Sequence, residues 1–348
     1  MNKEIASSLP SENKLIDMFS RSISYLRLSL TDRCNLRCMY CVTEEEGKGG
    51  PVKLRHDDLL TYEELLRVVR VAVRMGITKV RLTGGEPLVR RNVLGFIRDL
   101  NAIEQLTDVR LTTNGVLLNK YAQELFAAGV SKINVSLDTL RPERFASITG
   151  VDCFNDVWQG LHKALEVGFN PVKVNVVAMR HINDDEISDF VHLSKTMPLQ
   201  IRFIEFMPIG DSSRWNDETF ISSDEIKQRL EAHGELIPME RLQADGPAQV
   251  YRLGEDSVGS IGFISPMSHH FCDQCNRLRL TSAGGLRSCL LHDDEVDLRS
   301  VLRQGGGDEE ICKALLDAIR NKPKGHQLEE RLKNSGNNCH GQMSRIGG

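Results

Sequence analysis

The chain has 348 residues, 40% hydrophobic and 26% charged, a composition typical of a folded globular protein rather than a disordered or fibrous one. Its formal net charge of −4 argues against a general nucleic-acid-binding protein. The N-terminus lacks the apolar core of a secretory signal, and no stretch approaches the roughly 20 apolar residues of a membrane span. We therefore expect a cytoplasmic protein with reduced cysteines, in which clustered cysteines indicate metal binding or catalysis.

Short apolar strands alternate with helical patterns from about residue 23 to about residue 230. The first helix is predicted to begin at Thr61, where Glu64 completes a capping box, and to end at Gly76. Successive strand–helix units predict a parallel sheet with helices outside, either a barrel or a doubly wound sheet. The predicted strands are 23–30, 78–83, 108–113, 132–138, 172–179 and 200–206, and the other predicted helices are 91–100, 117–128, 156–167 and 184–195.

One face of each of the first five strands is polar, whereas buried parallel strands are usually apolar throughout. Because side chains alternate along a strand, each polar set points to one side. A ligand-lined barrel interior explains this pattern better than an open sheet does, although single residues could instead reach outward at strand ends. We therefore predict a partial (βα)6 barrel. The polar residues are Tyr25, Arg27, Ser29, Lys79, Arg81, Thr83, Arg110, Thr112, Asn114, Asn134, Ser136, Asp138, Lys173 and Asn175.

The alternation stops after about residue 240, which predicts a smaller C-terminal unit. Segments 249–253 and 260–264 are predicted to form a hairpin, and residues 309–320 a helix. The chain ends in a polar tail that finishes with Gly347 and Gly348. The predicted organisation is an N-terminal arm (1–20), a barrel core (21–235) and a C-terminal region (236–348).

The first cysteine cluster lies directly after the first predicted strand. Cys34, Cys38 and Cys41 have the spacing C-x3-C-x2-C, with an aromatic residue, Tyr40, before the last cysteine. Structural zinc sites and ordinary [4Fe–4S] clusters take four protein ligands. Three cysteines leave one iron open, and this spacing after a barrel strand resembles the signature of the radical S-adenosylmethionine (SAM) enzymes.

Further motifs follow the later strands. The adjacent glycines of the run 84–87 let a ligand approach the backbone closely, although the run alone is also compatible with a simple turn. The polar segments 112–115 and 136–138 and the segment 205–208 follow other strands. All lie at carboxyl ends of strands, where barrel enzymes build their active sites.

The second cysteine cluster has the spacing C-x2-C-x13-C. Zinc is a serious alternative here, with His269, His270 or His292 as a fourth ligand. Arg277 and Arg279 favour a different interpretation, because a structural zinc knuckle needs no cations at its edge. A second three-cysteine iron–sulfur cluster could bind a substrate whose anionic groups these arginines hold. The cysteines are Cys272, Cys275 and Cys289.

Together these motifs resemble the GTP 3′,8-cyclase family of molybdenum cofactor biosynthesis, within the radical SAM superfamily. The resemblance runs from Leu15 to Gly348. It depends most on three runs, YLRLSLTDRC at 25–34, VRLTGGEP at 80–87 and FCDQCNRLRLT at 271–281, together with the terminal Gly-Gly. The family often has Met-Pro after the third cysteine, whereas this chain has Val42 and Thr43 followed by an acidic run.

The resemblance implies two [4Fe–4S] clusters, SAM as cofactor and GTP as substrate. A SAM-derived 5′-deoxyadenosyl radical would abstract the C3′ hydrogen of GTP, after which C3′ would bond to C8 of guanine. It also implies an electron donor of the ferredoxin or flavodoxin type, hand-off to cyclic pyranopterin monophosphate synthase, and a monomer or homodimer. The implied residues are Cys34, Cys38 and Cys41 for the first cluster; Cys272, Cys275 and Cys289 for the second; Tyr40, Gly85, Ser136 and Met207 for SAM; Arg27, Arg81, Thr112, Lys173, Arg277, Leu278 and Arg279 for GTP; and Gly347 and Gly348 for a tail that enters the site.

Lys79 and Arg202 are our own additions to the basic set. Two rival functions remain on sequence grounds alone: a peptide-modifying radical SAM enzyme with auxiliary clusters, and a zinc-stabilised binding protein. Cys153, Cys312 and Cys339 are scattered along the chain, and we expect them to be ordinary free thiols.

Overall fold

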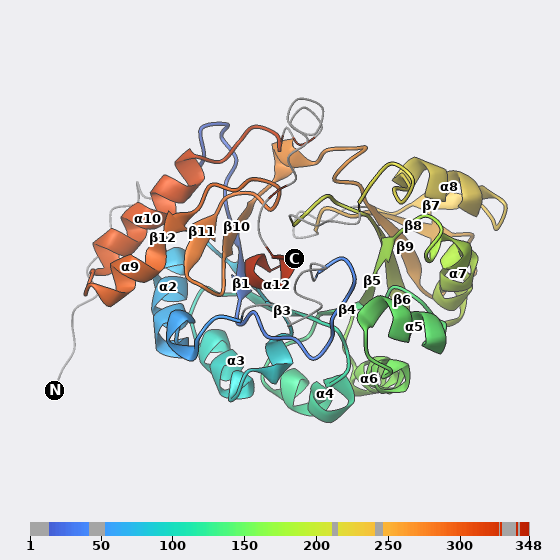
Figure 1. The fold of residues 1–348 in the computed structure, drawn as a ribbon, viewed down its shortest axis with the longest axis horizontal. Coiled ribbons are helices and arrows are strands. Elements are labelled where there is room, and N and C mark those ends of the chain that lie inside the picture. The colour runs from blue at the N-terminus through green and yellow to red at the C-terminus, as the bar shows by residue number, and fades with distance from the viewer. Residues whose placement is uncertain are drawn as a thin grey trace.

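The computed structural model describes residues 14–41, 53–210, 215–240, 246–326, 328, 339 and 342–347. Their strands form one sheet in the order β12-β11-β10-β1-β2-β3-β4-β5-β6-β9-β8-β7. Strands β1 to β6 are all parallel and adjacent in chain order, and the sheet curves around a central space with helices outside it (Figure 1). This is the partial (βα)6 barrel that the sequence predicts. The six strands are β1 (Tyr25–Ser29), β2 (Lys79–Thr83), β3 (Asp108–Thr113), β4 (Ile133–Ser136), β5 (Val172–Ala178) and β6 (Leu199–Glu205).

The helices follow the predicted alternation closely. The capping box at the start of the first long helix is confirmed, because Glu64 N–H donates to Thr61 Oγ1 at 3.2 Å and Thr61 N–H to Glu64 Oε2 at 2.7 Å. The sequence prediction missed α5, an additional helix between β4 and α6, which begins at Pro142. The helices are α2 (Tyr62–Arg74), α3 (Val93–Asn101), α4 (Leu118–Ala127), α5 (Pro142–Thr149), α6 (Phe154–Val167), α7 (Ile187–Thr196), α8 (Ser223–Glu231), α9 (Leu298–Arg303), α10 (Asp308–Arg320) and α12 (Met343–Ile346).

The apolar core lies between the strands and the surrounding helices rather than inside the curve. Leu26, Leu28, Val80 and Leu82 are completely buried there. Since side chains alternate along a strand, their neighbours, such as Arg27, point to the inner face. The barrel interior is therefore the polar side of the sheet, as the strand pattern predicts.

The C-terminal strands extend both edges of the barrel sheet. The predicted hairpin is confirmed as β8 (Gln249–Leu253) and β9 (Ser260–Ile264), and β9 pairs in parallel with β6. At the opposite edge, β10 (Arg277–Leu280) pairs in parallel with β1. The region after residue 235 thus shares the sheet of the core, and the predicted division into units stays a prediction. The remaining strands are β7 (Leu236–Pro238), β11 (Gly285–Arg287) and β12 (Val296–Asp297).

Within the residues that the structure describes, no helix combines the length and hydrophobicity needed to span a membrane.

Candidate functional site

A cavity of about 530 Å³ occupies the inner face of the curved sheet. Both cysteine triplets line it, so the β1–β10 pairing brings together loops that are more than 200 residues apart in the chain. Nearly all of the polar faces predicted from the strand pattern also line it, the exceptions being Ser29 and Lys173. Its wall is strongly basic, through Arg27, Lys79, Arg81, Arg110, Arg202, Arg277 and Arg279.

The cations of the wall are buried close to one another. Burial, together with neighbouring arginines, lowers the pKa of Arg279 well below its usual value, and burial together with nearby cations lowers the pKa of Arg27 to about 10. Burial opposes ionisation of Tyr25, yet Arg81 and Arg27 lower its pKa to about 7. Arg81 Nε donates to the Tyr25 hydroxyl at 2.5 Å. Such a wall suits a ligand with several negative charges.

The first cysteine triplet forms a compact loop after β1. Cys41 N–H donates to the Cys38 carbonyl at 2.9 Å, and the Asn114 amide lies 3.6 Å from Cys34 Sγ. Burial raises the pKa of all three thiols, that of Cys41 to about 12 and that of Cys38 well above its usual value. Binding of a metal centre here would release these protons, because thiolates are the ligands. Three thiol donors on one short loop fit an iron–sulfur cluster with an open iron.

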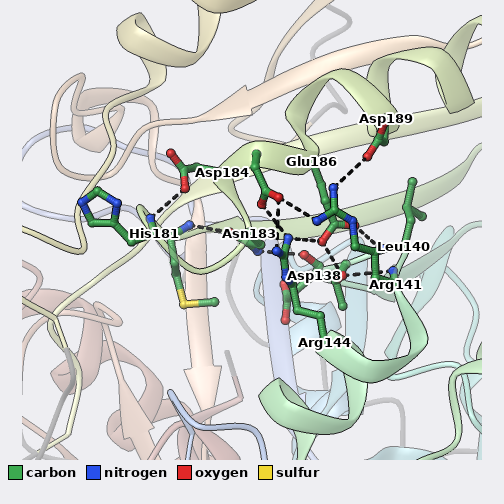
Figure 2. Close-up of polar contacts among 12 residues, drawn as sticks. Asp138, Leu140, Arg141, Arg144, His181, Asn183, Asp184, Glu186 and Asp189 are labelled. Carbon is green, nitrogen blue, oxygen red and sulfur yellow. Dashed lines mark hydrogen bonds and ion pairs between the residues drawn. The ribbon is translucent and has the colours of Figure 1, made fainter.

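Tyr40 is fixed within this loop by a buried carboxylate. Its hydroxyl donates to Asp138 Oδ2 at 2.6 Å, and Asp138 Oδ1 accepts Val177 N–H at 2.8 Å. The Asn183 amide donates to the Asp138 carbonyl at 2.7 Å (Figure 2). Burial raises the pKa of Asp138 to about 6. The end of β4 thus orients the aromatic residue of the cysteine loop.

A second buried carboxylate holds the segment that follows Asp138. Glu186 is completely buried and accepts Thr139 Oγ1–H at 2.6 Å and Leu140 N–H at 2.7 Å. Arg144 also donates to it, as Figure 2 shows. This network connects the loop after β4 to the start of α7. It thereby holds the segment that directly follows Asp138 in place.

The Gly84–Pro87 run after β2 packs against the backbone of the cysteine loop. Gly85 N–H donates to the Thr31 carbonyl at 2.7 Å, and Glu86 N–H to the Arg33 carbonyl at 2.8 Å. A Cβ at Gly85 would overlap the Arg33 carbonyl oxygen, so glycine is required for this approach. The Glu86 carboxylate accepts Asn114 N–H at 2.7 Å, which joins this turn to the loop after β3.

The second cysteine triplet faces the same cavity from the β10–β11 side. Burial raises the pKa of the Cys275 thiol, but the charges of Arg277 and Lys322 outweigh burial and lower this pKa to about 6. Burial raises the pKa of Cys272. Cations therefore dominate at Cys275, whereas burial dominates at Cys272 and at the first triplet. The sequence signal for Arg277 was its position after Cys275, but nothing local pointed to Lys322.

The histidines considered as zinc ligands are engaged with other groups. His269 Nε2 lies 2.6 Å from Asp224 Oδ2, and His292 Nδ1 lies 3.2 Å from Asp294 Oδ2. His270 lines the cavity, but its Nδ1 lies 2.7 Å from His326 Nε2. Over the described ranges, no three His, Cys, Asp or Glu side chains form a single-ion site.

The C-terminal helix α12 lies inside the curve of the sheet and packs against β1 (Figure 1). Met343 and Ser344 line the cavity, and an Arg279 N–H donates to the Gly347 carbonyl. The tail residue Gly347 therefore contacts one of the predicted substrate-binding arginines. Gly348 lies outside the described residues.

Most residues predicted for the site line one cavity. Leu278 differs, because its side chain is completely buried in the core on the opposite face of β10, as alternation from Arg277 and Arg279 requires. Lys173 is buried and does not line the cavity. The cavity residues that the sequence analysis did not single out include Arg37, Lys53, His326, Met343 and Ser344. The predicted residues that line it are Arg27, Cys34, Cys38, Tyr40, Cys41, Arg81, Gly85, Thr112, Ser136, Met207, Cys272, Cys275, Arg277, Arg279 and Cys289.

Solved structures share this fold. The crystal structure of Streptococcus suis SuiB bound to S-adenosylmethionine superposes with a TM-score of 0.59 at 14% identity. The match covers 86% of this chain and 68% of SuiB. At this identity the likeness concerns the fold alone.

Family models and curated relatives match nearly the whole chain. Residues 28–194 match the Radical SAM superfamily, and residues 199–328 match Molybdenum Cofactor Synthesis C. The GTP 3′,8-cyclase of Thermodesulfovibrio yellowstonii is 50% identical over 89% of this chain and 94% of its own length. The GTP 3′,8-cyclase of Syntrophomonas wolfei is 48% identical over 90% of this chain and 95% of its own length. The GTP 3′,8-cyclase of Desulforamulus reducens is 45% identical over 96% of this chain and 100% of its own length. The chain therefore belongs to the GTP 3′,8-cyclase family of the radical SAM superfamily.

Proposed function

We propose that this protein is a GTP 3′,8-cyclase, which converts GTP to (8S)-3′,8-cyclo-7,8-dihydroguanosine 5′-triphosphate in the first step of molybdenum cofactor biosynthesis. The observation that carries this proposal is a single cavity with a cysteine triplet at each of two loops and a basic wall. One triplet serves the radical source and the other the substrate. Family membership supports the same reaction.

The first triplet, Cys34, Cys38 and Cys41, would hold a [4Fe–4S] cluster whose open iron takes SAM. When bound, these groups supply a 5′-deoxyadenosyl radical that removes the C3′ hydrogen of GTP. The protein itself orients the reactants and excludes side reactions. We assign Tyr40, Gly85, Ser136 and Met207 to SAM binding, because all four line the cavity.

The second triplet, Cys272, Cys275 and Cys289, would hold a [4Fe–4S] cluster whose open iron meets the guanine base. The triphosphate carries about four negative charges, which basic side chains of the wall neutralise. Gly347 and Gly348 complete the site as a tail without side chains beside the substrate, a role supported by the Arg279 contact to the Gly347 carbonyl. Arg277 and Arg279 join Cys34, Cys38, Cys41 and these glycines as the catalytic set. We assign Arg27, Arg81, Thr112, Lys173, Arg277, Leu278 and Arg279 to GTP binding. Leu278 would contribute its backbone, because its side chain is buried in the core, and Lys173 is buried outside the cavity lining.

The reaction also implies partners. A ferredoxin- or flavodoxin-like protein would supply electrons, and cyclic pyranopterin monophosphate synthase would consume the product. None of the nine cysteines forms a disulfide, which supports a reducing, cytoplasmic location. The family resemblance implies a monomer or homodimer.

The test is anaerobic reconstitution of the full chain, followed by an assay with SAM, a reductant and GTP. We expect about eight irons per chain and 5′-deoxyadenosine formation that depends on GTP. GTP deuterated at C3′ should transfer its label to 5′-deoxyadenosine. ATP in place of GTP is the substrate control, and Cys34→Ala is the cluster control. Four irons per chain, bound zinc, or SAM cleavage at the same rate with and without GTP would contradict the proposal.

A further inference from the structure

Residues 322–326 wrap around the second cysteine triplet although they lie far from it in sequence. The Lys322 ammonium donates to the Ser288 carbonyl at 2.6 Å and to the Arg277 carbonyl at 2.9 Å. It thereby joins the strand that follows Cys275 to the loop that leads into Cys289. One side chain thus holds the backbone next to Cys275 and the backbone next to Cys289.

The same segment is attached to Cys272 by two further contacts. The backbone N–H of His326 donates to the Cys272 thiol. Arg21, from the other end of the chain, donates to the Cys272 carbonyl at 2.7 Å and to the Lys324 carbonyl at 3.1 Å. The segment therefore contacts the surroundings of all three cysteines.

Lys322 is also a buried charge close to the cysteines. The residue is only 4% exposed, and its ammonium is held by two carbonyls, one two residues after Cys275 and one directly before Cys289. A buried ammonium is costly unless it is compensated, and here the two carbonyls accept its hydrogen bonds.

The two triplets differ in this respect. Lys53, beside the first triplet, is only half-buried and lines the cavity, and its ammonium donates to the Asp32 carbonyl at 2.9 Å. Lys322, in contrast, is buried, and the two carbonyls that hold it flank Cys275 and Cys289. The reduction potential of an iron–sulfur cluster depends on its net charge, on hydrogen bonds to its sulfurs and on solvent exposure. A cation beside a thiolate favours the reduced cluster, which carries one more negative charge.

We infer that Lys322 is a positioning residue of the second triplet that raises the reduction potential of the iron–sulfur cluster bound there. This inference rests on the proposed function, because it requires a cluster at Cys272, Cys275 and Cys289. Its role is distinct from substrate contact, since Lys322 does not line the cavity.

The experiment is a redox titration of the reconstituted full chain without GTP, followed by electron paramagnetic resonance and accompanied by an iron and sulfide count. Three variants are compared with the unmodified protein: Lys322→Gln removes the charge, Lys322→Arg keeps it, and Lys324→Gln removes an exposed charge from the same segment. The same variants are also made in a chain in which Cys34, Cys38 and Cys41 are replaced by alanine. This chain lacks the first cluster, so its paramagnetic signal is assigned to the second cluster.

Lys322→Gln is expected to shift the oxidised-to-reduced equilibrium of the second cluster at least tenfold towards oxidised. For a one-electron couple that corresponds to a midpoint lower by about 59 mV. Lys322→Arg and Lys324→Gln should each stay within about twofold of the unmodified protein, and the first cluster should not shift in any variant.

A Lys322→Gln protein with eight irons and an unshifted second cluster would overturn the inference while leaving the proposed function intact. Equal shifts in Lys322→Gln and Lys322→Arg would also overturn it, because loop geometry rather than charge would then set the potential. If the unmodified chain binds only four irons, both the inference and the proposed function fail. If Lys322→Gln does not fold, Lys322→Met and Lys322→Arg are compared in the same way, and loss of the second cluster in both overturns the electrostatic role.

Discussion

Glu86 should make the stability of the cluster-free chain depend on pH. The side chain is completely buried, and its carboxylate accepts Leu88 N–H at 3.0 Å, Thr113 Oγ1–H at 2.9 Å and Asn114 N–H at 2.7 Å. Burial outweighs these donors and raises the pKa of Glu86 from 4.5 to about 7. A carboxyl with a raised folded-state pKa is protonated more readily in the native protein than in the unfolded chain.

The sign and size of the effect follow from linkage. Between pH 4.5 and 7 the native state binds the extra proton, so the free energy of unfolding falls as pH rises through this window. Each unit of pKa shift corresponds to 1.36 kcal/mol, so the Glu86 contribution amounts to about 3 kcal/mol across the window. Glu86→Gln removes this dependence. It also loses an acceptor for one buried donor, an offset of about 1–3 kcal/mol that does not vary with pH.

The assay is urea unfolding of unmodified protein and Glu86→Gln from pH 4.5 to 8, with Glu104→Gln as an exposed glutamate control. We expect the stability advantage of the unmodified protein over Glu86→Gln to shrink by about 3 kcal/mol between pH 4.5 and 8. The reasoning is refuted if this difference changes by less than about 0.5 kcal/mol, or if the Glu104→Gln difference changes equally.

Three further changes test the site. Deleting Gly347 and Gly348 should abolish cyclisation while iron and sulfide contents stay at the full-chain level, and normal turnover by the truncated chain would contradict this. Gly85→Ala forces a Cβ onto the Arg33 carbonyl oxygen, so we expect SAM to bind at least tenfold more weakly in equilibrium dialysis, with the second cluster unaffected. Glu186→Ala leaves the buried Thr139 hydroxyl and the Leu140 N–H without their acceptor, whereas Arg144 keeps Asp185, so urea unfolding should show a loss of about 2–4 kcal/mol; a loss below about 1 kcal/mol would refute a structural role.

Local patterns in the sequence predicted the barrel and most of its inner wall. The period of two in β1 to β5 is a property of each strand alone, and it indicated which side chains face the cavity. The same period also places the Leu278 side chain on the core face, between Arg277 and Arg279, which leaves the backbone of Leu278 for the proposed contact to GTP. The cysteine triplets were recognisable because their spacing is short.

Contacts between distant segments were not predictable in this way. Arg21 meets Lys324, and Lys322 meets Arg277 and Ser288, only because β10 pairs with β1 and the C-terminal chain returns over both. The alternation ended near residue 240, which suggested a separate unit, yet β9 and β10 extend the barrel sheet at its two edges. Parallel pairing carries no local signature, since its partners lie far apart in the chain.

The sequence by itself determined the ligand types, their spacing and the polar faces of the strands, because each depends on residues a few positions apart. Only the tertiary structure decided that the two cysteine triplets share one cavity and that the buried Lys322 is held beside the second of them. The physical reason is that charge and burial act through space. The environment of a thiol is therefore set by whichever segments fold against it, however distant they are along the chain.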